Sequence, residues 1–352
     1  MTGPLRFGVL GCADIAVRRT LPAICSHPDT TLTWVASRDP AKAARVADRF
    51  GCRATDYAGL LERDDVDAVY LPLPPSLHLE WGAQVLACGK HLLVEKPLAP
   101  DAAQAAELAQ LAAESGLVLR DNMTFLHHPV HARVRELVAA GRLGEVRALH
   151  AAFCFPPLSN VDIRYSRALA GGALLDAGVY PLRCAQLMLG EQLRVAGAVL
   201  REDPDRGVDL SGQALLVSAG GVPASLAFGF EHSYGSWYTL WGSTARLHLD
   251  RAFTPPAYRQ PVLRIEEQDR VEELTLAPYH QFEGSVGAFA AAARDGGRDE
   301  SVWRAAALGT LRLADQIRDL AVRVPAQPRR GQPIQPAGSR AATGISAGHD
   351  GG

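Results

Sequence analysis

Cysteine and the common metal-binding patterns are scarce in this sequence. Its 352 residues include six cysteines, none of which forms a C-x-x-C pair. The eleven histidines include no H-E-x-x-H pattern. A disulfide framework and a zinc site both need ligands at short, regular spacings. We therefore expect reduced, buried thiols and no protein-bound metal.

An excess of charge of one sign is also missing, as is any long apolar run. The chain has 36 Lys and Arg against 38 Asp and Glu, a formal net charge of −2. Binding to nucleic acid or to a membrane surface needs a basic field, which this balance does not supply. No run reaches the ~20 apolar residues of a membrane-spanning helix, and the first residues do not resemble a signal peptide. We expect a cytoplasmic protein that binds neither nucleic acid nor membranes.

The N-terminal third alternates between two kinds of apolar pattern. Strand-length apolar runs occur at Leu5–Leu10, Thr31–Ala36, Asp67–Leu71, His91–Glu95 and Leu117–Arg120. Between them, apolar residues follow helical spacing at Ile15–Cys25, Ala41–Phe50, Leu77–Cys88 and Ala102–Glu114. This alternation predicts an α/β domain with a doubly wound, parallel sheet of the Rossmann type over residues 1–124.

Strand-like runs dominate the rest of the chain. They occur at Val146–Phe155, Leu193–Arg201, Ser211–Ser218, Ala224–Glu231, Trp237–Trp241, Val262–Glu266 and Val271–Leu276. Helices are expected at about Gly172–Leu189, Phe282–Arg294 and Glu300–Val322. We predict an α+β domain over residues 125–324, with one open and mostly antiparallel sheet. Residues 325–352 lack apolar periodicity, so we predict a disordered tail there.

The first strand runs into the turn Gly11-Cys12-Ala13-Asp14-Ile15-Ala16. The dinucleotide fingerprint G-x-G-x-x-G provides a tight turn, close approach to a pyrophosphate and close helix packing. Gly11 keeps the first role, and the small residues Ala13 and Ala16 replace the other two glycines. Amide groups at the start of the following helix can hold phosphate. We expect these six residues to bind a dinucleotide, with a turn that binds no ligand as the alternative.

The end of the second predicted strand bears on the choice of dinucleotide. NAD enzymes place an acidic residue here, on the ribose 2′-hydroxyl. This chain has Ser37 and Arg38, a hydroxyl and a guanidinium that suit a 2′-phosphate. The neighbouring Asp39 and Pro40 suit the N-cap and first position of the next helix. We therefore expect NADP(H) rather than NAD(H).

Three more stretches lie where ligands bind in such a fold. A proline-rich loop from Leu71 through Pro72 to His78 follows the third predicted strand, and Glu95 and Lys96 follow the fourth. In the second half, Asp176 and Tyr180 are four residues apart, so they share one face of the predicted helix. A rigid loop, a solvated lysine and a buried Tyr–Asp pair are the structural alternatives.

Three of these motifs occur in the order and spacing of the Gfo/Idh/MocA oxidoreductase family. They are the degenerate dinucleotide turn, Glu95-Lys96-Pro97, and Gly171-Gly172-Ala173-Leu174-Leu175-Asp176-Ala177-Gly178-Val179-Tyr180. The resemblance covers about residues 5–322. Within the family, the chain most resembles the sugar 3-ketoreductases of deoxysugar biosynthesis. Those enzymes use NADPH to reduce the 3-keto group of a dTDP-linked 3,4-diketo-2,6-dideoxyhexose.

The resemblance implies a reaction site and a cofactor site. Lys96 and Tyr180 are expected to flank the reacting carbonyl, with Asp176 beside them as the third catalytic residue. Either Tyr180 or Lys96 could donate the proton, and an adjacent Lys96 ammonium is expected to favour the Tyr180 phenolate. Besides the turn, Ser37 and Arg38, the expected cofactor-binding residues are Leu71, Pro72, His78, Glu95, Lys96, Asn122 and Arg164. Arg164 and Arg183 are also candidates for binding a substrate diphosphate, whereas His127 and His128 are expected to be structural.

Two other functions stay open on the same scaffold. One is an NADP-dependent dehydrogenase of a free sugar or a trans-dihydrodiol, since relatives of that kind also carry tyrosine at position 180. The other is a non-catalytic dinucleotide sensor, which would have no use for Lys96, Asp176 and Tyr180 together. An open sheet face exposes apolar surface, so we also expect a homodimer or homotetramer formed through that sheet.

Overall fold

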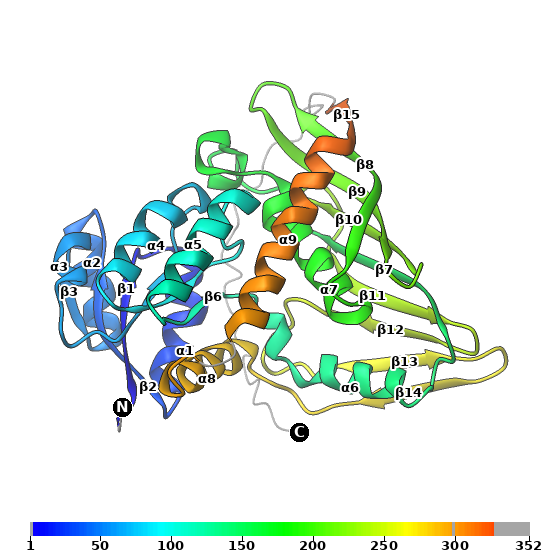
Figure 1. The fold of residues 1–352 in the computed structure, drawn as a ribbon, viewed down its shortest axis with the longest axis horizontal. Coiled ribbons are helices and arrows are strands. Elements are labelled where there is room, and N and C mark those ends of the chain that lie inside the picture. Colours follow the sequence, from blue (N-terminus) through cyan, green and yellow to red (C-terminus); the bar gives the residue numbers. More distant parts are fainter. Residues whose placement is uncertain (1–2, 298–299, 327–352) are drawn as a thin grey trace, which may run out of the picture.

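Two sheets organise the computed structural model, which describes residues 3–297 and 300–326 (Figure 1). The first sheet has six parallel strands in the order β3-β2-β1-β4-β5-β6. These are β1 Leu5–Leu10, β2 Thr30–Ala36, β3 Arg53–Thr55, β4 Ala68–Leu71, β5 His91–Val94 and β6 Leu119–Asp121. The strand order reverses between β1 and β4, which is where a ligand crevice opens in such sheets. The predicted doubly wound parallel sheet is confirmed.

The helices of this half follow the predicted alternation with two differences. They are α1 Leu21–Ser26, α2 Pro40–Phe50, α3 Tyr57–Leu61, α4 His78–Ala87 and α5 Ala102–Glu114. The first predicted helix consists of a π-helical segment, η1 (Ala16–Thr20), followed by α1. The second difference is the short pair β3 and α3, for which no element was predicted. Asp39 is the N-cap of α2 as predicted, because its side chain accepts hydrogen bonds from the amides of Ala41 and Lys42.

The second sheet has nine strands in the order β14-β13-β12-β11-β7-β10-β9-β8-β15. These are β7 Val146–Cys154, β8 Leu193–Asp203, β9 Val208–Ser218, β10 Pro223–Gly229, β11 Gly235–Gly242, β12 Arg246–Asp250, β13 Val262–Glu266, β14 Val271–Thr275 and β15 Ala321–Pro325. Only the pairs β7–β10 and β8–β15 are parallel among these described strands. The predicted open, mostly antiparallel sheet is confirmed, although β12 and β15 were not predicted.

The last two helices connect the two sheets. Helix α9 (Glu300–Leu320) contributes Leu311 to the core of the first sheet and Leu313 to the core of the second. Helix α8 (Gln281–Arg294) returns to the first sheet, where the Phe289 ring lies 5.7 Å from the Phe7 ring of β1. In Figure 1, α8 lies beside α1 and α9 runs between the two halves. The predicted boundary after residue 124 thus separates the sheets but not these helices.

The C-terminal end of the described chain differs from the prediction. The last helix ends at Leu320 instead of Val322, and the next five residues form β15 alongside β8. The amide of Ala326 then donates a hydrogen bond to the carbonyl oxygen of Glu202 at 2.6 Å. Pro325 and Ala326 are therefore ordered by backbone pairing and do not belong to the predicted disordered tail. The rest of that segment, 327–352, lies outside the described residues.

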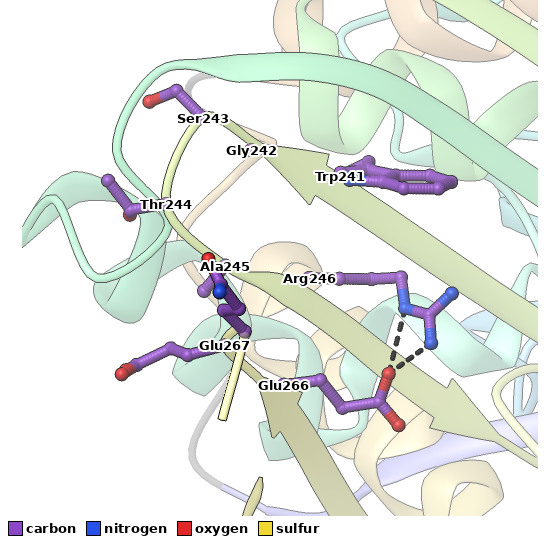
Figure 2. Close-up of a pocket in the computed structure, with 9 residues that line it drawn as sticks. Trp241, Gly242, Ser243, Thr244, Ala245, Arg246, Glu266 and Glu267 are labelled. Atoms are coloured by element: carbon purple, nitrogen blue, oxygen red, sulfur yellow. Dashed lines mark hydrogen bonds and ion pairs between the residues drawn. The ribbon is translucent and has the colours of Figure 1, made fainter. Parts of the chain in front are cut away.

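One face of the second sheet is open. Strand register places Val199, Leu215, Trp241 and Val271 on this face, and each of them is exposed. A cavity of about 380 Å³ lies at the ends of β11 to β13. Figure 2 shows residues that line it, among them Arg246, which pairs with Glu266 and lies near the Trp241 ring. None of the predicted site residues lines this cavity. No helix among the described residues is long and apolar enough to cross a membrane.

Candidate active site

The dinucleotide turn lies at the strand-order reversal, between β1 and η1. Gly11 has a φ of +118°, which a side chain rarely tolerates, and a Cβ there would lie 2.7 Å from a methyl carbon of Leu73. Ala16 is fully buried, as close packing of the following helix requires. Cys12 is buried with its thiol directed at the Ala36 carbonyl, while Asp14 is exposed and pairs with Arg18. Cys12 can therefore contact a ligand only through its backbone.

Ser37 and Arg38 lie at the carboxyl end of β2, next to this turn. The Ser37 hydroxyl accepts a hydrogen bond from the amide of Asp39 at 3.2 Å. Arg38 is exposed beside the Tyr57 phenol: burial raises the pKa of that phenol, and the Arg38 charge opposes the rise. An exposed guanidinium at this edge is available to an anionic group.

The proline-rich loop after β4 is braced by His78. Leu71 and Pro72 are buried, and Pro72 faces the Gly11 turn through its carbonyl oxygen. The His78 ring nitrogens lie 3.0 Å from the carbonyl oxygen of Pro97 and 2.8 Å from that of Leu73. Burial lowers the pKa of His78 to about 4, so the ring is neutral. Its side chain has no exposed surface, and we correct the predicted cofactor contact to a structural link between two loops.

Lys96 connects the edge of the first sheet to the second half of the chain. Its Nζ donates to Asp176 twice, to Oδ1 at 2.7 Å and to the backbone oxygen at 2.8 Å. The other carboxylate oxygen of Asp176 accepts from Arg164 Nε at 2.7 Å. Burial alone would raise the pKa of Asp176, but the charges of Lys96 and Arg164 hold it at about 2. Asp176 is therefore ionised, and Lys96 keeps one N–H for another acceptor.

Tyr180 lies against Lys96 at the start of α7 (Val179–Leu189). The Lys96 Nζ is 5.2 Å from the centroid of the Tyr180 ring, which is packed among Phe125, Phe153 and Phe253. No described residue hydrogen-bonds the Tyr180 hydroxyl. Burial, together with the Glu95 and Asp176 carboxylates, raises its pKa above the ordinary value of 10.0. Burial and these carboxylates favour the protonated phenol, and Asp176 offsets part of the Lys96 charge, so the free enzyme does not favour the phenolate as expected.

A network of buried hydrogen bonds connects the residues next to Lys96. Glu95 Oε1 accepts from the Tyr70 hydroxyl at 2.5 Å and from Asn122 Nδ2 at 2.8 Å. The Asn122 side-chain oxygen accepts from Ser285 in α8 at 2.8 Å. Burial raises the pKa of Glu95. Glu95 and Asn122 thus order the strand ends on either side of Lys96. Tyr70 and Ser285 were missed because nothing in a strand or helix pattern marks a buried hydroxyl as a partner.

The segment that carries Asp176 is shaped by an aspartate that the sequence reasoning also missed. Residues Leu174–Gly178 form a π-helical turn before α7, inside what was predicted as one helix. The Leu174 amide donates to Asp209 Oδ2 at 2.6 Å, and a Cβ on Gly172 would lie 2.3 Å from Asp209 Oδ1. Burial raises the pKa of Asp209 to about 6. Because Gly172 has no side chain, the Asp209 carboxylate can approach this turn and hold it by a hydrogen bond.

Two further predictions concern residues near the site. Arg183 is almost fully buried and pairs with Asp121 at 2.8 Å, so its guanidinium is not accessible to a substrate diphosphate. His127 stacks on Trp303, and burial lowers its pKa to about 4. His128 caps the helix α6 (Pro129–Ala139) by accepting from the amide of Val130. The structural role predicted for both histidines agrees with these contacts.

The turn fits a dinucleotide, and the described residues provide no metal cluster. At Gly11 a Cβ would collide with Leu73, so the glycine permits the tight turn that starts the dinucleotide fingerprint. No group of three or more His, Cys, Asp or Glu side chains in the described part of the chain could hold a metal ion. The Lys96 ammonium, with one N–H not used by Asp176, and the Tyr180 phenol thus lie next to each other. Such a pair suits proton donation to an oxygen on which negative charge develops.

Comparisons with known proteins agree with this geometry. Residues 5–123 match the model of the Gfo/Idh/MocA oxidoreductase family with an NAD-binding Rossmann fold, and residues 131–248 match the C-terminal domain of that family. A dTDP-3,4-didehydro-2,6-dideoxy-α-D-glucose 3-reductase from Streptomyces violaceoruber is 53% identical over 90% of this chain and 95% of its own length. A D-xylose 1-dehydrogenase (NADP⁺) from Haloferax volcanii is 33% identical over 85% of this chain and 93% of its own length.

A solved structure is similar over nearly the whole described chain. It is a 3-ketoreductase from Actinomadura kijaniata in complex with NADP and TDP-benzene, with a TM-score of 0.90 and 48% identity. The match covers 92% of this chain and 100% of the other. That protein was also solved with one tyrosine replaced by phenylalanine and with one lysine replaced by alanine. The two replaced residues are separated by as many positions as Lys96 and Tyr180.

Proposed function

The chain belongs to the Gfo/Idh/MocA family of oxidoreductases, and we propose that it is an NADPH-dependent 3-ketoreductase of a nucleotide-linked sugar. Its substrate is a dTDP-linked 3,4-diketo-2,6-dideoxyhexose, and its place is in the biosynthesis of a deoxysugar. The observation that carries this proposal is the contact of Lys96 with both Asp176 and the Tyr180 ring. The high identity to a reductase with this substrate supports it.

The cofactor is held by the turn between β1 and η1 and by the end of β2. Gly11 through Ala16 face the pyrophosphate with their backbone, and Arg38 with Ser37 faces the 2′-phosphate. Bound NADPH supplies the hydride that reduces the sugar carbonyl. Ionised Asp176 holds the Lys96 ammonium in place, while Glu95 and Asn122 fix the strand ends around it. Arg164 acts through Asp176 and has a positioning role.

Tyr180 donates the proton in this proposal. Its raised pKa keeps the phenol protonated across the physiological range, so an acid is present when charge develops on the carbonyl oxygen. The third N–H of Lys96 donates to the same oxygen, and its positive charge stabilises the alkoxide. The O–H bond of Tyr180 breaks as the new alcohol O–H forms. The resulting phenolate lies beside the Lys96 ammonium, and it takes up a proton from solvent after the reaction.

The proposed function is tested by NADPH oxidation against a panel of substrates. The dTDP-diketohexose is expected to be reduced, whereas D-xylose and a trans-dihydrodiol are expected to give no NADPH-linked turnover in either direction. The 33% identity to a xylose dehydrogenase makes oxidation of a free sugar the second candidate. Turnover of xylose without turnover of the nucleotide sugar would establish that candidate instead. Turnover by the wild type that falls at least 100-fold in Tyr180→Phe distinguishes an enzyme from a dinucleotide sensor.

We further propose that two or four copies associate through the open face of the second sheet. Trp241 and Val271 are 51% and 53% exposed there, with Val199 and Leu215 along the same face. Apolar surface of this kind favours a second subunit over solvent. Sedimentation of the wild type and of Trp241→Glu tests the proposal, because a charge on this apolar face should yield monomers. A wild-type monomer would contradict it.

A further inference from the structure

Both arginines that the sequence offered for a substrate diphosphate are already paired. Arg183 forms a buried ion pair with Asp121, and Arg164 contacts the carboxylates of Asp162 and Asp176. A guanidinium between two carboxylates has little attraction left for another anion. If the substrate is a nucleotide-linked sugar, as proposed above, its diphosphate therefore needs another cation near Tyr180.

Arg251 is an arginine in this region without a negative partner. It follows β12, and its guanidinium carbon lies 4.0 Å from the centroid of the Tyr234 ring. No described residue forms a hydrogen bond or an ion pair with its side chain. Stacking on an aromatic ring holds a guanidinium in place while leaving its N–H groups free for an acceptor. Arg251 is thus positioned and unpaired.

The backbone around Arg251 connects it to a residue that packs against Tyr180. Arg251 has a φ of +54°, and only one other described residue besides glycine has a positive φ. Directly after it, Ala252 donates to the backbone oxygen of Ser236, and Phe253 donates to the Ser236 hydroxyl. Phe253 then packs against Tyr180, with ring centroids 5.9 Å apart. The turn that directs Arg251 is therefore continuous with the wall of the active site.

Tyr234, on which Arg251 stacks, is linked to the segment that contains Phe253. Its hydroxyl lies 2.9 Å from the hydroxyl of Thr254, so the ring that supports Arg251 is tied to the segment that holds Phe253. Thr254 also lines a cavity of about 230 Å³ between this segment and η1, with Arg18 and Arg19 on the opposite side. The segment that follows Arg251 therefore connects Phe253, which packs on Tyr180, with a cavity that is also lined by Arg18 and Arg19.

We propose that Arg251, stacked on Tyr234, binds the diphosphate of the nucleotide-linked substrate and thereby selects it over free sugars. A guanidinium forms two parallel hydrogen bonds with phosphate oxygens, which a sugar without phosphate cannot accept. This inference rests on the proposed function, since it names the group that anchors that substrate. Arg251 acts on binding and contacts none of the reacting atoms.

Calorimetric titration of the NADP⁺-loaded enzyme with dTDP and with thymidine tests the inference. Arg251→Gln is expected to weaken dTDP binding by roughly 10- to 100-fold, the loss of one charged hydrogen-bonding group, and to leave thymidine affinity unchanged. Arg251→Lys keeps the charge but loses the planar fork, so its affinity for dTDP should lie in between. Arg49→Gln is the matched control, because Arg49 also stacks on an aromatic ring, Phe50, but lies at the end of α2. Unchanged NADP⁺ affinity shows that each variant is folded.

Two outcomes would overturn the inference. If Arg251→Gln binds dTDP as tightly as the wild type does, another group holds the diphosphate, and the proposed reductase function is unaffected. If that variant loses affinity for dTDP and thymidine equally, Arg251 supports the site without contacting the diphosphate. Failure of the wild-type enzyme to bind dTDP would instead contradict the proposed function itself.

Discussion

Replacing Lys96 by methionine removes an ammonium but keeps most of the side chain's length. Two of its three N–H groups are used by Asp176, at 2.7 and 2.8 Å, which leaves one for the substrate. A full charge about 4 Å from a developing oxyanion is worth about 4 kcal/mol at an effective dielectric constant of about 20. Because Asp176 offsets part of that charge, we expect a smaller loss, about 3 kcal/mol, or roughly 100-fold in kcat.

The assay is a single-turnover measurement of NADPH oxidation at saturating nucleotide sugar, so that binding does not enter the rate. Tyr180→Phe should lose about 10²- to 10⁴-fold, the usual contribution of a positioned acid. The double variant should be little slower than the poorer single variant, because the two residues act on one oxygen. Arg133→Met, which removes an exposed cation from α6, is the control and should turn over normally.

Two results would refute this reasoning. If Tyr180→Phe keeps nearly full turnover while Lys96→Met is inactive, the proton comes from Lys96 or from water. If both variants turn over normally, the site has been placed on the wrong residues.

Three further predictions concern the cofactor, the carboxylate and the last strand. Arg38→Ala should raise the KM for NADPH more than the KM for NADH, by a factor that corresponds to about 1.5–3 kcal/mol of binding free energy. Equal effects on the two KM values in steady-state kinetics would show that Arg38 does not bind the 2′-phosphate. The pKa of Asp176 is lowered from 3.8 to about 2 in the folded protein. Its ionised form therefore contributes about 2 kcal/mol to the free energy of unfolding above pH ~4. This contribution is lost as the pH falls towards 2. The difference in Tm between the wild type and Asp176→Asn should therefore shrink on acidification, and a constant difference would contradict the assignment. A chain that ends at Leu320 should melt below one that ends at Ala326, because β15 and its bonds to β8 are lost; equal Tm values in calorimetry would show that β15 adds no stability.

The first sheet was predictable because its central strands are buried on both faces. Strand β1, for example, is apolar at every position except Arg6, and it ends at the predicted residue. Strand β3 has three residues, all at least partly exposed, so no apolar pattern marks it. The first two residues of strand β15 were predicted as the end of a helix and Pro325 as disordered, because the strand depends on pairing with β8, more than 100 positions earlier in the chain.

The site residues were predictable for a similar reason, but their electrostatics were not. Lys96 follows a buried strand, and Asp176 and Tyr180 have helical spacing, so their positions are local properties of the chain. The pKa of Tyr180 depends mainly on burial and also on Glu95, both of which the tertiary fold supplies. The same holds for Arg164, whose pairing with Asp176 removes it from the candidates for a diphosphate.

Transfer of deuterium from NADPH labelled at C4 of the nicotinamide tests the central claim most directly. The enzyme is incubated with labelled NADPH and the dTDP-linked 3,4-diketo-2,6-dideoxyhexose, and the product is analysed by NMR. The account predicts deuterium at C3 of the sugar, at a rate that falls at least 100-fold in Tyr180→Phe. Deuterium at another carbon, or none in the nucleotide sugar while the label enters a free sugar or diol pair, would contradict it.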